Sequence, residues 1–310
     1  IGLVIRLYDL TDAPLDFHPT RQLYSAIKAR GMFYVNQPTD ETGKRDLAVN
    51  LWQEQGLIEP PVLERLTALT YQVIGREILW VPRVYSILFW TIGGLALVAL
   101  TKRLMDKNAA VFALLLFMVT PYTAIASRAF QPDPLMIMFM TLAIWGMVRW
   151  IDQDNIKNAL LMGAFAGMAI FIKSVVIFPL AFAFIGIVFS EKKNFKAVFR
   201  SKTVWLTGIL TTLPYILFLV YGLLISGELQ SQFSLRFFPQ LWIDPVFWLR
   251  WIEMINKVVG FEFFLFAILG TSLLRKTSYR ILLFALFLGY FIYGMTLPYH
   301  ISTHDYYQLP

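Results

Sequence analysis

The sequence predicts an all-α protein that crosses a membrane many times. Of its 310 residues, 57% are hydrophobic and only 15% are charged, and the mean hydropathy is +0.60. Soluble domains are less apolar and more highly charged than this. In addition, apolar runs close to the ~20 residues that a helix needs to cross a bilayer recur along most of the chain.

Composition also excludes several kinds of site. With no cysteine in the chain, disulfides, thiolate catalysis and cysteine metal sites are excluded. The three histidines, His18, His300 and His304, leave little room for an all-histidine metal site. The net charge of +7 predicts nucleic-acid binding only if the basic residues form a patch, and along this chain they are spread over separate loops. We predict neither a cofactor nor a protein-bound metal, and a divalent cation stays open.

The first 78 residues are predicted to be the end of one span followed by a long outward loop. Residues 1–5 have the composition of the last turn of an apolar helix, and the absence of a starting methionine indicates a part of a longer protein. Within the loop at 6–78, a helix is expected from Pro19 to Arg30, ending at Gly31. Residues 32–59 are too polar to span a membrane, and an amphipathic interfacial helix is expected to follow Pro61 and to close at Gly75.

Eight apolar runs follow and form the predicted transmembrane bundle, residues 79–298. Together with the truncated first span they make about nine spans in one domain covering 1–310. The expected complete spans are 79–100, 109–125, 135–150, 159–172, 175–189, 204–225, 260–274 and 281–297. A second long outward loop occupies 227–259, with an interfacial helix over 245–259, and a last outward segment starts at 299.

Charges in the loops predict the orientation. One set of loops, after alternate spans, carries thirteen basic and four acidic residues, whereas the rest of the chain carries fourteen basic and sixteen acidic ones. By the positive-inside rule the basic set is cytoplasmic. Both long loops then face outward. This assignment requires residues 159–189 to form a hairpin of two short spans that turns near Lys173, because one long span would separate the two basic loops that flank it.

Residues 9–21, just after the first span, are rich in charged and polar side chains. They hold three carboxylates, Asp9, Asp12 and Asp16, together with His18 and Arg21. A carboxylate at the boundary of water and lipid is a candidate general base if other parts of the chain converge on the same side. Alternatively, Asp16 only caps the helix that follows.

Four more features fall on the predicted outer side. Arg128 to Pro134 reads Arg-Ala-Phe-Gln-Pro-Asp-Pro, where Asp133 is either functional or a helix cap before Pro134. Lys173 is an ammonium in an apolar stretch, explained either by snorkelling to the interface or by a phosphate partner. The loop with Arg236 and the following Phe-Phe-Pro could line a substrate groove.

The fourth feature is the segment from Tyr299 to Gln308, which directly follows the last span. It contains His300, His304, Asp305 and three tyrosines within a few residues. Tyrosines are common at membrane interfaces. An imidazole beside a carboxylate is more specific, because it can donate to phosphate or relay a proton.

Taken together, these features resemble the protein O-mannosyltransferase and aminoarabinose-transferase group of membrane glycosyltransferases. The resemblance lies in the order and common side of an acidic first loop, a Pro-Asp-Pro at 132–134, a lysine after a Gly/Ala-rich span and a closing His-Asp-Tyr-Tyr-Gln-Leu-Pro. It covers nearly all of the chain. One departure is that Phe17 follows Asp16 where the family carries a second acidic residue, so that Asp12 and Asp16 both remain candidates for the catalytic carboxylate.

The resemblance implies the C-type glycosyltransferase fold and inversion at the anomeric carbon. It implies a polyprenyl-phosphate sugar as donor, a lipid, glycan or protein as acceptor, contact with membrane lipids and no nucleic acid. We expect an integral protein of a bacterial inner membrane whose site faces the periplasm. The alternative function is a transporter or lipid flippase. We expect Asp16 and Asp133 to be catalytic, and the residues that bind donor phosphate or substrate to be His18, Arg21, Arg128, Lys173, His304, Asp305, Tyr306 and Tyr307.

Overall fold

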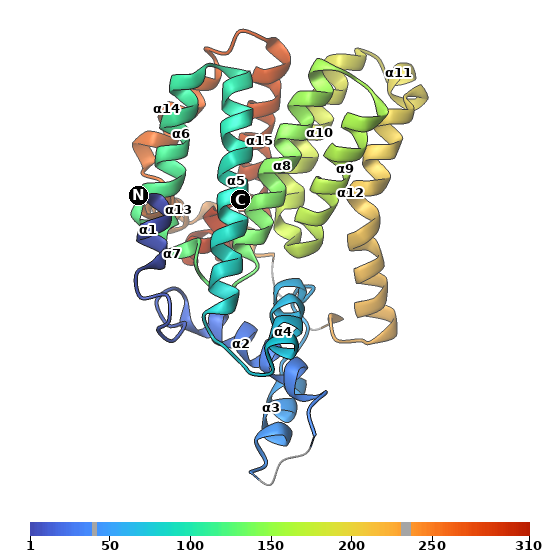
Figure 1. Cartoon of the computed structure of the whole chain (residues 1–310). Helices are drawn as coiled ribbons and strands as arrows, with labels where there is room; N and C mark the ends of the chain where they lie inside the picture. Colours follow the sequence, from blue (N-terminus) through green and yellow to red (C-terminus); the bar gives the residue numbers. More distant parts are fainter. Residues whose placement is uncertain (39–41, 231–236) are drawn as a thin grey trace.

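In the computed structural model, which describes residues 1–38, 42–230 and 237–310, helices form a long bundle with a smaller helical layer at one end (Figure 1). Among the described residues, five helical segments are long and apolar enough to cross a membrane. They are α5 (Val81–Leu104), α8 (Asp133–Asp152), the segment Ser174–Lys192 that ends in α10 (Ile177–Lys192), the segment Lys202–Ile225 that begins with α12 (Lys202–Val220), and α15 (Thr277–Thr296). The described chain is therefore a polytopic helical membrane protein.

Three shorter apolar helices stand in the same bundle: α6 (Lys107–Val119), α9 (Ile156–Ile172) and α14 (Phe261–Thr271). Each of the eight predicted complete spans thus falls on an apolar helix, although only five of these helices have spanning length. The first helix, α1 (Gly2–Leu7), packs against α6 and α7 (Pro121–Ala126). The count of nine spans stays a prediction.

The predicted span 109–125 is divided at Pro121 into α6 and α7. Proline lacks a backbone N–H and cannot continue the ladder of a preceding helix. Arg6 of α1 is fully buried at this break, where its Nη1 donates to the carbonyl oxygen of Met118 at 2.6 Å and its Nε to Ser127 Oγ at 2.6 Å. A buried guanidinium therefore satisfies backbone that the break leaves unpaired.

Helix α8 lies at the centre of the bundle, and most of its apolar stretch is buried. It contacts α5 on one side and α9 on another, and α9 in turn packs against α12. Gly163 and Gly167 of α9 lie directly against the α12 backbone, and a Cβ on Gly167 would meet the carbonyl oxygen of Leu210 at 2.2 Å. Such small-xxx-small spacing lets membrane helices approach closely. By contrast, only 6% of the apolar stretch of the segment Lys202–Ile225 is buried.

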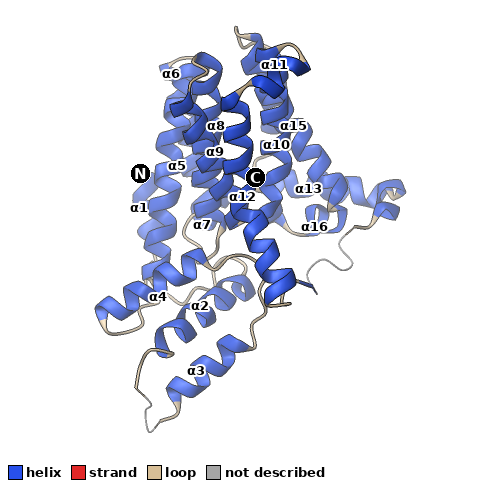
Figure 2. Cartoon of the chain, turned by 90° about the vertical axis from the view of Figure 1, so that its right-hand side faces the viewer, coloured by secondary structure: helices blue, strands red, loops and turns tan. Residues whose placement is uncertain are grey.

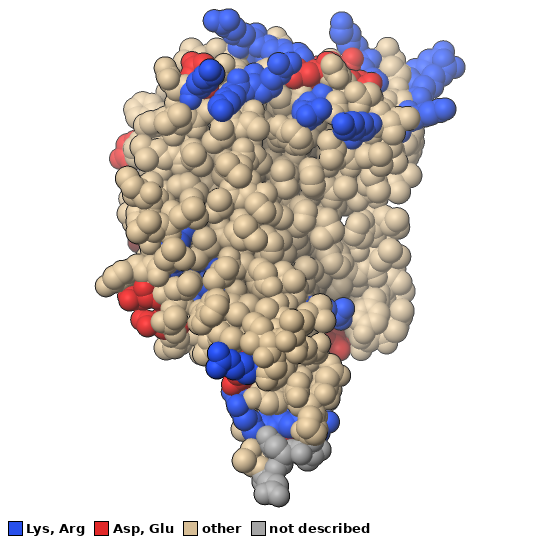
Figure 3. Space-filling model, viewed as in Figure 1, with Lys and Arg blue, Asp and Glu red and all other residues tan. Residues whose placement is uncertain are grey.

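The hairpin predicted over residues 159–189 is confirmed. After α9, the chain turns through a 3₁₀ helix, Ser174–Val176, and returns as α10. Lys192 at the end of α10 forms an ion pair with Asp154, just before α9, so both ends of the hairpin lie together. Figure 3 shows Lys and Arg gathered at this end of the bundle, near α11 (Phe195–Arg200), above a broad uncharged band. Loops that the sequence predicts to be basic therefore lie together at one end of the bundle.

The opposite end carries the layer formed by α2 (Pro19–Tyr34), α3 (Lys44–Gln53) and α4 (Val62–Ile74), seen at the bottom of Figure 2. The expected end of α2 at Gly31 is wrong. Gly31 lies inside the helix because α3 packs on it, with Trp52 where a Cβ would stand. Helix α3 was not predicted at all. Helix α4 ends as expected at Gly75, whose φ of 81° favours glycine.

The remaining elements close the bundle at the same end. A 3₁₀ helix, Pro239–Ile243, leads into α13 (Pro245–Val258), whose buried face is formed by Phe247, Trp251, Ile255 and Val258. The apolar residues Ile252 and Val259 are exposed. Two short helices, α16 (Pro298–Thr303) and a 3₁₀ turn Asp305–Gln308, end the chain against α13. Arg236 of the predicted groove lies outside the described residues.

Candidate active site

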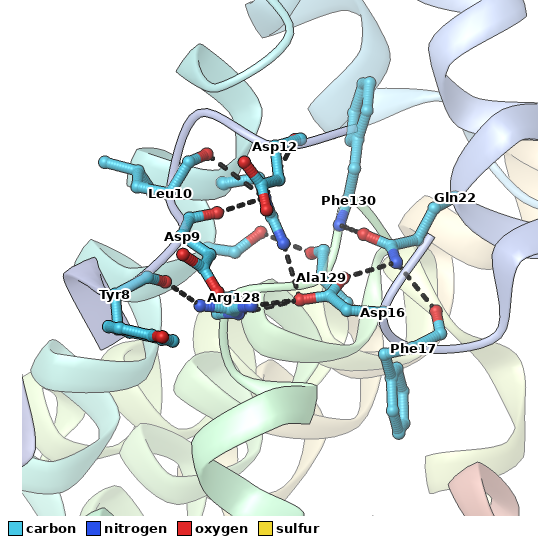
Figure 4. A network of polar contacts seen from close by, with 12 residues as sticks. Tyr8, Asp9, Leu10, Asp12, Asp16, Phe17, Gln22, Arg128, Ala129 and Phe130 are labelled. Carbon is cyan, nitrogen blue, oxygen red and sulfur yellow. Dashed lines mark hydrogen bonds and ion pairs between the residues drawn. The ribbon is translucent and has the colours of Figure 1, made fainter. Parts of the chain in front are cut away.

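The carboxylate of Asp16 lies between two guanidinium groups (Figure 4). Its Oδ2 accepts hydrogen bonds from Arg83 Nη2 at 2.5 Å and from Arg128 Nε at 2.8 Å. Its Oδ1 accepts one longer bond of 3.2 Å from Gln22 Nε2. Burial alone would raise the pKa of Asp16, but the hydrogen bonds from Gln22 and Arg128 and the charges of both arginines outweigh burial and lower that pKa.

The same two arginines hold the loop that carries Asp16. Arg83 Nη1 donates to the backbone carbonyl oxygens of Asp9, Leu10 and Asp12 at 3.0–3.1 Å, and Arg128 donates to that of Tyr8. The side chain of Arg83 is fully buried at the start of α5. The first loop is therefore fixed to the bundle by two cations.

Asp16 does not cap α2. The N-cap residue is His18, with φ at 46°, and no side chain caps this helix. Gln22 in the first turns of α2 instead joins two loops (Figure 4). Its Oε1 accepts from the backbone N–H of Phe130 at 2.9 Å, while its Nε2 donates to the carbonyl oxygen of Phe17 at 2.8 Å. The acidic loop and the Arg128 to Pro134 turn thus lie side by side.

Lys173 and Asp133 form a buried ion pair. The Nζ of Lys173 lies 2.6 Å from Oδ1 of Asp133, and both side chains are less than 5% exposed. Consequently, snorkelling does not explain Lys173, whereas its predicted contact with a phosphate stays a prediction. Capping is also wrong for Asp133, because the N-cap of α8 is Pro132 and no side chain caps it. Lys173 Nζ further lies 4.9 Å from the ring centre of Tyr306 and 5.3 Å from that of Tyr307.

Asp305 is the centre of a third polar group. Its Oδ1 lies 2.5 Å from His18 Nε2 and accepts from Tyr122 Oη at 3.0 Å, while Lys257 Nζ lies 2.5 Å from Oδ2. Burial would raise the pKa of Asp305, but the hydrogen bonds from His18 and Lys257 hold it well below its usual range. The imidazole paired with Asp305 is therefore His18, not its neighbour His304, whose Nδ1 contacts Thr303 Oγ1 at 2.8 Å.

The second and third groups meet around Tyr306, and the Asp16 group adjoins them through Phe17, which shares an apolar cluster with Tyr306. Its ring centre lies 4.8 Å from that of His18 and 5.5 Å from that of His304, and it also faces Lys173. Burial raises the pKa of the Tyr306 phenol to about 12. Arg21 pairs with Glu59 at 2.7 Å, and its charge also acts on Asp133 and Tyr306. The fold thus brings the predicted residues of the first loop, α8, the hairpin turn and the final segment into one cluster.

Sequence reasoning missed several members of this cluster. Arg83 had a usable signal, since it is an arginine in the first turn of an apolar helix, directly after Pro82. Gln22, Glu59 and Tyr122 had none, because such residues are ordinary in loops and helix ends. Lys257 lies in the predicted interfacial helix 245–259, where it is 58% exposed and still reaches Asp305.

An apolar cavity of about 340 Å³ opens beside the cluster. It lies between α8, α10, α13, α14 and α15, and its lining includes Met140, Phe264 and Leu286. Gln308 to Pro310, directly after Tyr306 and Tyr307, form one of its walls. The cavity therefore adjoins the final segment that carries Tyr306 and Tyr307.

Residues 58–221 match the family described as dolichyl-phosphate-mannose-protein mannosyltransferase. No curated protein and no solved structure matches the chain. The matched segment contains Arg83, Arg128, Asp133 and Lys173, whereas Asp16 and Asp305 lie on either side of it. Since the match covers more than half of the sequence, the chain belongs to this mannosyltransferase family and is a membrane glycosyltransferase of that type.

Proposed function

We propose that the protein transfers a sugar, with inversion, from a polyprenyl-phosphate donor to a lipid, glycan or protein acceptor at the outer face of the membrane. In a bacterium this is the periplasmic face of the inner membrane. The observation that carries the proposal is the meeting of carboxylates and cations around Tyr306, in a segment that continues into the wall of an apolar cavity. Family membership favours this function over a transporter or flippase.

In this proposal Asp16 acts on the acceptor hydroxyl. Transfer forms a bond between the acceptor oxygen and the anomeric carbon, breaks the bond from that carbon to the phosphate oxygen, and releases the acceptor proton. Oδ1 of Asp16, with only one long hydrogen bond, has lone pairs left to receive this proton or to orient the hydroxyl. The lowered pKa keeps Asp16 ionised, and the two arginines fix its direction.

The donor is proposed to enter from the other side of the cluster. The apolar cavity accommodates part of the polyprenyl chain, which places the phosphate near the final segment. His304 is half-buried there, and Lys257 is more than half exposed, so that both can approach the leaving phosphate. Charge-assisted hydrogen bonds from such groups stabilise the negative charge that develops on the phosphate.

Asp133 and Lys173 are better suited to positioning than to proton transfer. Both are buried and already paired, and Lys173 supports Tyr306 and Tyr307 through their ring faces. We therefore propose that this pair holds the final segment, with His304 and Asp305, over the site.

A donor assay tests the proposal. The purified protein in proteoliposomes is given a mixture of polyprenyl-phosphate sugars with radiolabelled sugar moieties and a membrane extract as acceptor source. We expect label to leave at least one donor in step with formation of free polyprenyl phosphate. Intact donors throughout the mixture, with protein shown to be folded, would contradict the proposed transfer.

A further inference from the structure

A small pocket of about 280 Å³ lies at the end of the bundle where Lys and Arg gather (Figure 3). Its walls come from the last turns of α5 and α8 and from the start of α9. Ala99 and Arg103 of α5 face Trp145 and Arg149 of α8, and Asn158 of α9 completes the lining. None of the described residues of the candidate active site lines this pocket.

Arg149 is held in place at this pocket but has no counter-ion. Its guanidinium lies 4.9 Å from the ring centre of Trp145, one turn earlier on α8, and its Nε donates to Asn158 Oδ1 at 3.2 Å. Within residues 1–38, 42–230 and 237–310, no carboxylate oxygen lies within 4.0 Å of its charged nitrogens. The ring and the amide fix the guanidinium, and its Nη1 and Nη2 are left to bind an anion.

The carboxylate at the pocket, Asp152, is already shared between two other cations. Its Oδ2 accepts from Arg103 Nε at 2.6 Å, and its Oδ1 lies 3.2 Å from Lys276 Nζ. Tyr279 Oη donates to the same Oδ1 at 2.6 Å. Together with Arg149, three cations therefore stand here against one carboxylate. Asp152 orients Arg103 without neutralising the pocket.

Two general rules also place arginines at such positions. Arg103 and Arg149 both lie in the last turn of a helix, where a cation complements the helix dipole, and both belong to loops that the positive-inside rule assigns to the cytoplasm. Neither rule requires a cavity between the two arginines, or a guanidinium fixed by a ring and an amide. These two features indicate a binding site.

The shape of the pocket indicates what it binds. Ala99 is exposed and Trp145 only half-buried, so the apolar wall is reached from the bilayer, at the level where tryptophans gather in membrane proteins. Pockets for drug-sized ligands measure about 300–1,000 Å³. A smaller pocket with cations at the helix ends and apolar side chains below them fits a lipid head group whose acyl chains stay in the bilayer.

We propose that this pocket binds the phosphate of an anionic membrane phospholipid, such as phosphatidylglycerol, between Arg103 and Arg149. The planar donor fork of an arginine matches a phosphate with two parallel hydrogen bonds. Arg149 and Asp133 are sixteen residues apart on α8, about 24 Å along the helix. The lipid site therefore lies at the opposite end of α8 from the candidate active site, and it does not depend on the proposed transfer.

Lipid binding tests the site without any need for activity. The full chain is equilibrated with phosphatidylglycerol or phosphatidylcholine of identical acyl chains, and bound lipids are counted by native mass spectrometry. Arg149→Gln should lower retention of phosphatidylglycerol about tenfold, as expected for loss of a charge-assisted contact. Trp145→Leu, which keeps the charge but removes the ring under it, should also lower retention.

The matched control is Arg200→Gln. It removes the same charge from an exposed position of α11 at the same end of the bundle, and it should retain phosphatidylglycerol like the parent protein. Equal losses in Arg149→Gln and Arg200→Gln would show attraction by overall charge and overturn the pocket. Unchanged retention in Arg149→Gln would do the same. Displacement of the lipid by millimolar inorganic phosphate would show a site for the free ion instead.

Thermal unfolding in mixed micelles gives a second readout. A ligand that binds only the folded protein raises Tm, so phosphatidylglycerol should raise the Tm of the parent and of Arg200→Gln above the value in phosphatidylcholine. Most of this rise should be lost in Arg149→Gln. With phosphatidylcholine alone the two variants should unfold at the same temperature, because both side chains are exposed. An equal rise in all three proteins would contradict the lipid site.

Discussion

The ion pair between Lys173 and Asp133 gives the sharpest prediction at the scale of single residues. Lys173→Met should destabilise the protein by roughly 3–5 kcal/mol, because it leaves the carboxylate of Asp133 buried without its cation. Asp133→Asn combined with Lys173→Met removes both charges and should recover most of the loss. Thermal unfolding in detergent checks both. Simple additivity of the two changes would mean that the pair is not coupled.

His304 predicts how donor binding depends on pH. Burial and the nearby His18 lower the pKa of His304 below its ordinary value of about 6.5, so the imidazole is mostly neutral at pH 7 and gains its charge only on acidification. Donor affinity should therefore rise as the pH falls from 8 to 5.5. In His304→Gln this rise should be lost, as measured by donor binding at each pH. The same rise in the variant would exclude His304 from the phosphate site.

Many of the residues that the sequence singles out lie close together in the fold, but their pairings could not be predicted. Asp16 was linked to His18 and Arg21 because they are neighbours in sequence. In the fold its partners are Arg83 and Arg128, while His18 turns to Asp305 and Arg21 to Glu59. Pairing depends on which loops the bundle brings together, and residue spacing carries no information on contacts over such separations.

At the scale of elements, the contact of α9 with α12 gives a matched pair of substitutions. Gly167→Ala should destabilise the protein by about 1–3 kcal/mol, because its Cβ would meet the Leu210 carbonyl oxygen at 2.2 Å. Gly208→Ala on α12 has no heavy atom within 4 Å of the added Cβ and should be neutral or slightly stabilising. Thermal unfolding compares the two. Equal stability of both variants would contradict the close packing of these helices.

The helices were predicted well where the apolar pattern of the sequence is strong and poorly where that pattern is weak. Spans and both amphipathic helices, α4 and α13, lie close to their expected positions. Helix α3 was missed because half of its ten residues are polar and it is stabilised by packing on α2 at Gly31. Gly31 was predicted to end α2, but it lies inside that helix and contacts α3. Local sequence does not distinguish a glycine that ends a helix from one that lets two helices pack closely.

At the scale of the whole molecule, the basic end seen in Figure 3 predicts the topology. The chain has no cysteine, so single cysteines give a clean label. Asn36→Cys, in the exposed segment after α2, should react with an impermeant thiol reagent added to intact cells. Lys196→Cys, exposed in α11 at the basic end, should react only after the membrane is opened. Labelling of position 196 in intact cells would reverse the orientation.

The central claim is that the cluster around Tyr306 and the adjoining first loop form the site of sugar transfer. In this site Asp16 acts on the acceptor. Its most direct test is the rate of transfer by Asp16→Asn, with Asp12→Asn as control, at equal amounts of folded protein. Asp12 bonds Arg83 through its backbone carbonyl oxygen, while its carboxylate acts on Arg83 through charge alone, so loss of that charge should affect the site far less. We expect turnover to fall about 100- to 10,000-fold in Asp16→Asn and to change little in Asp12→Asn. Near-normal transfer by Asp16→Asn would contradict the account.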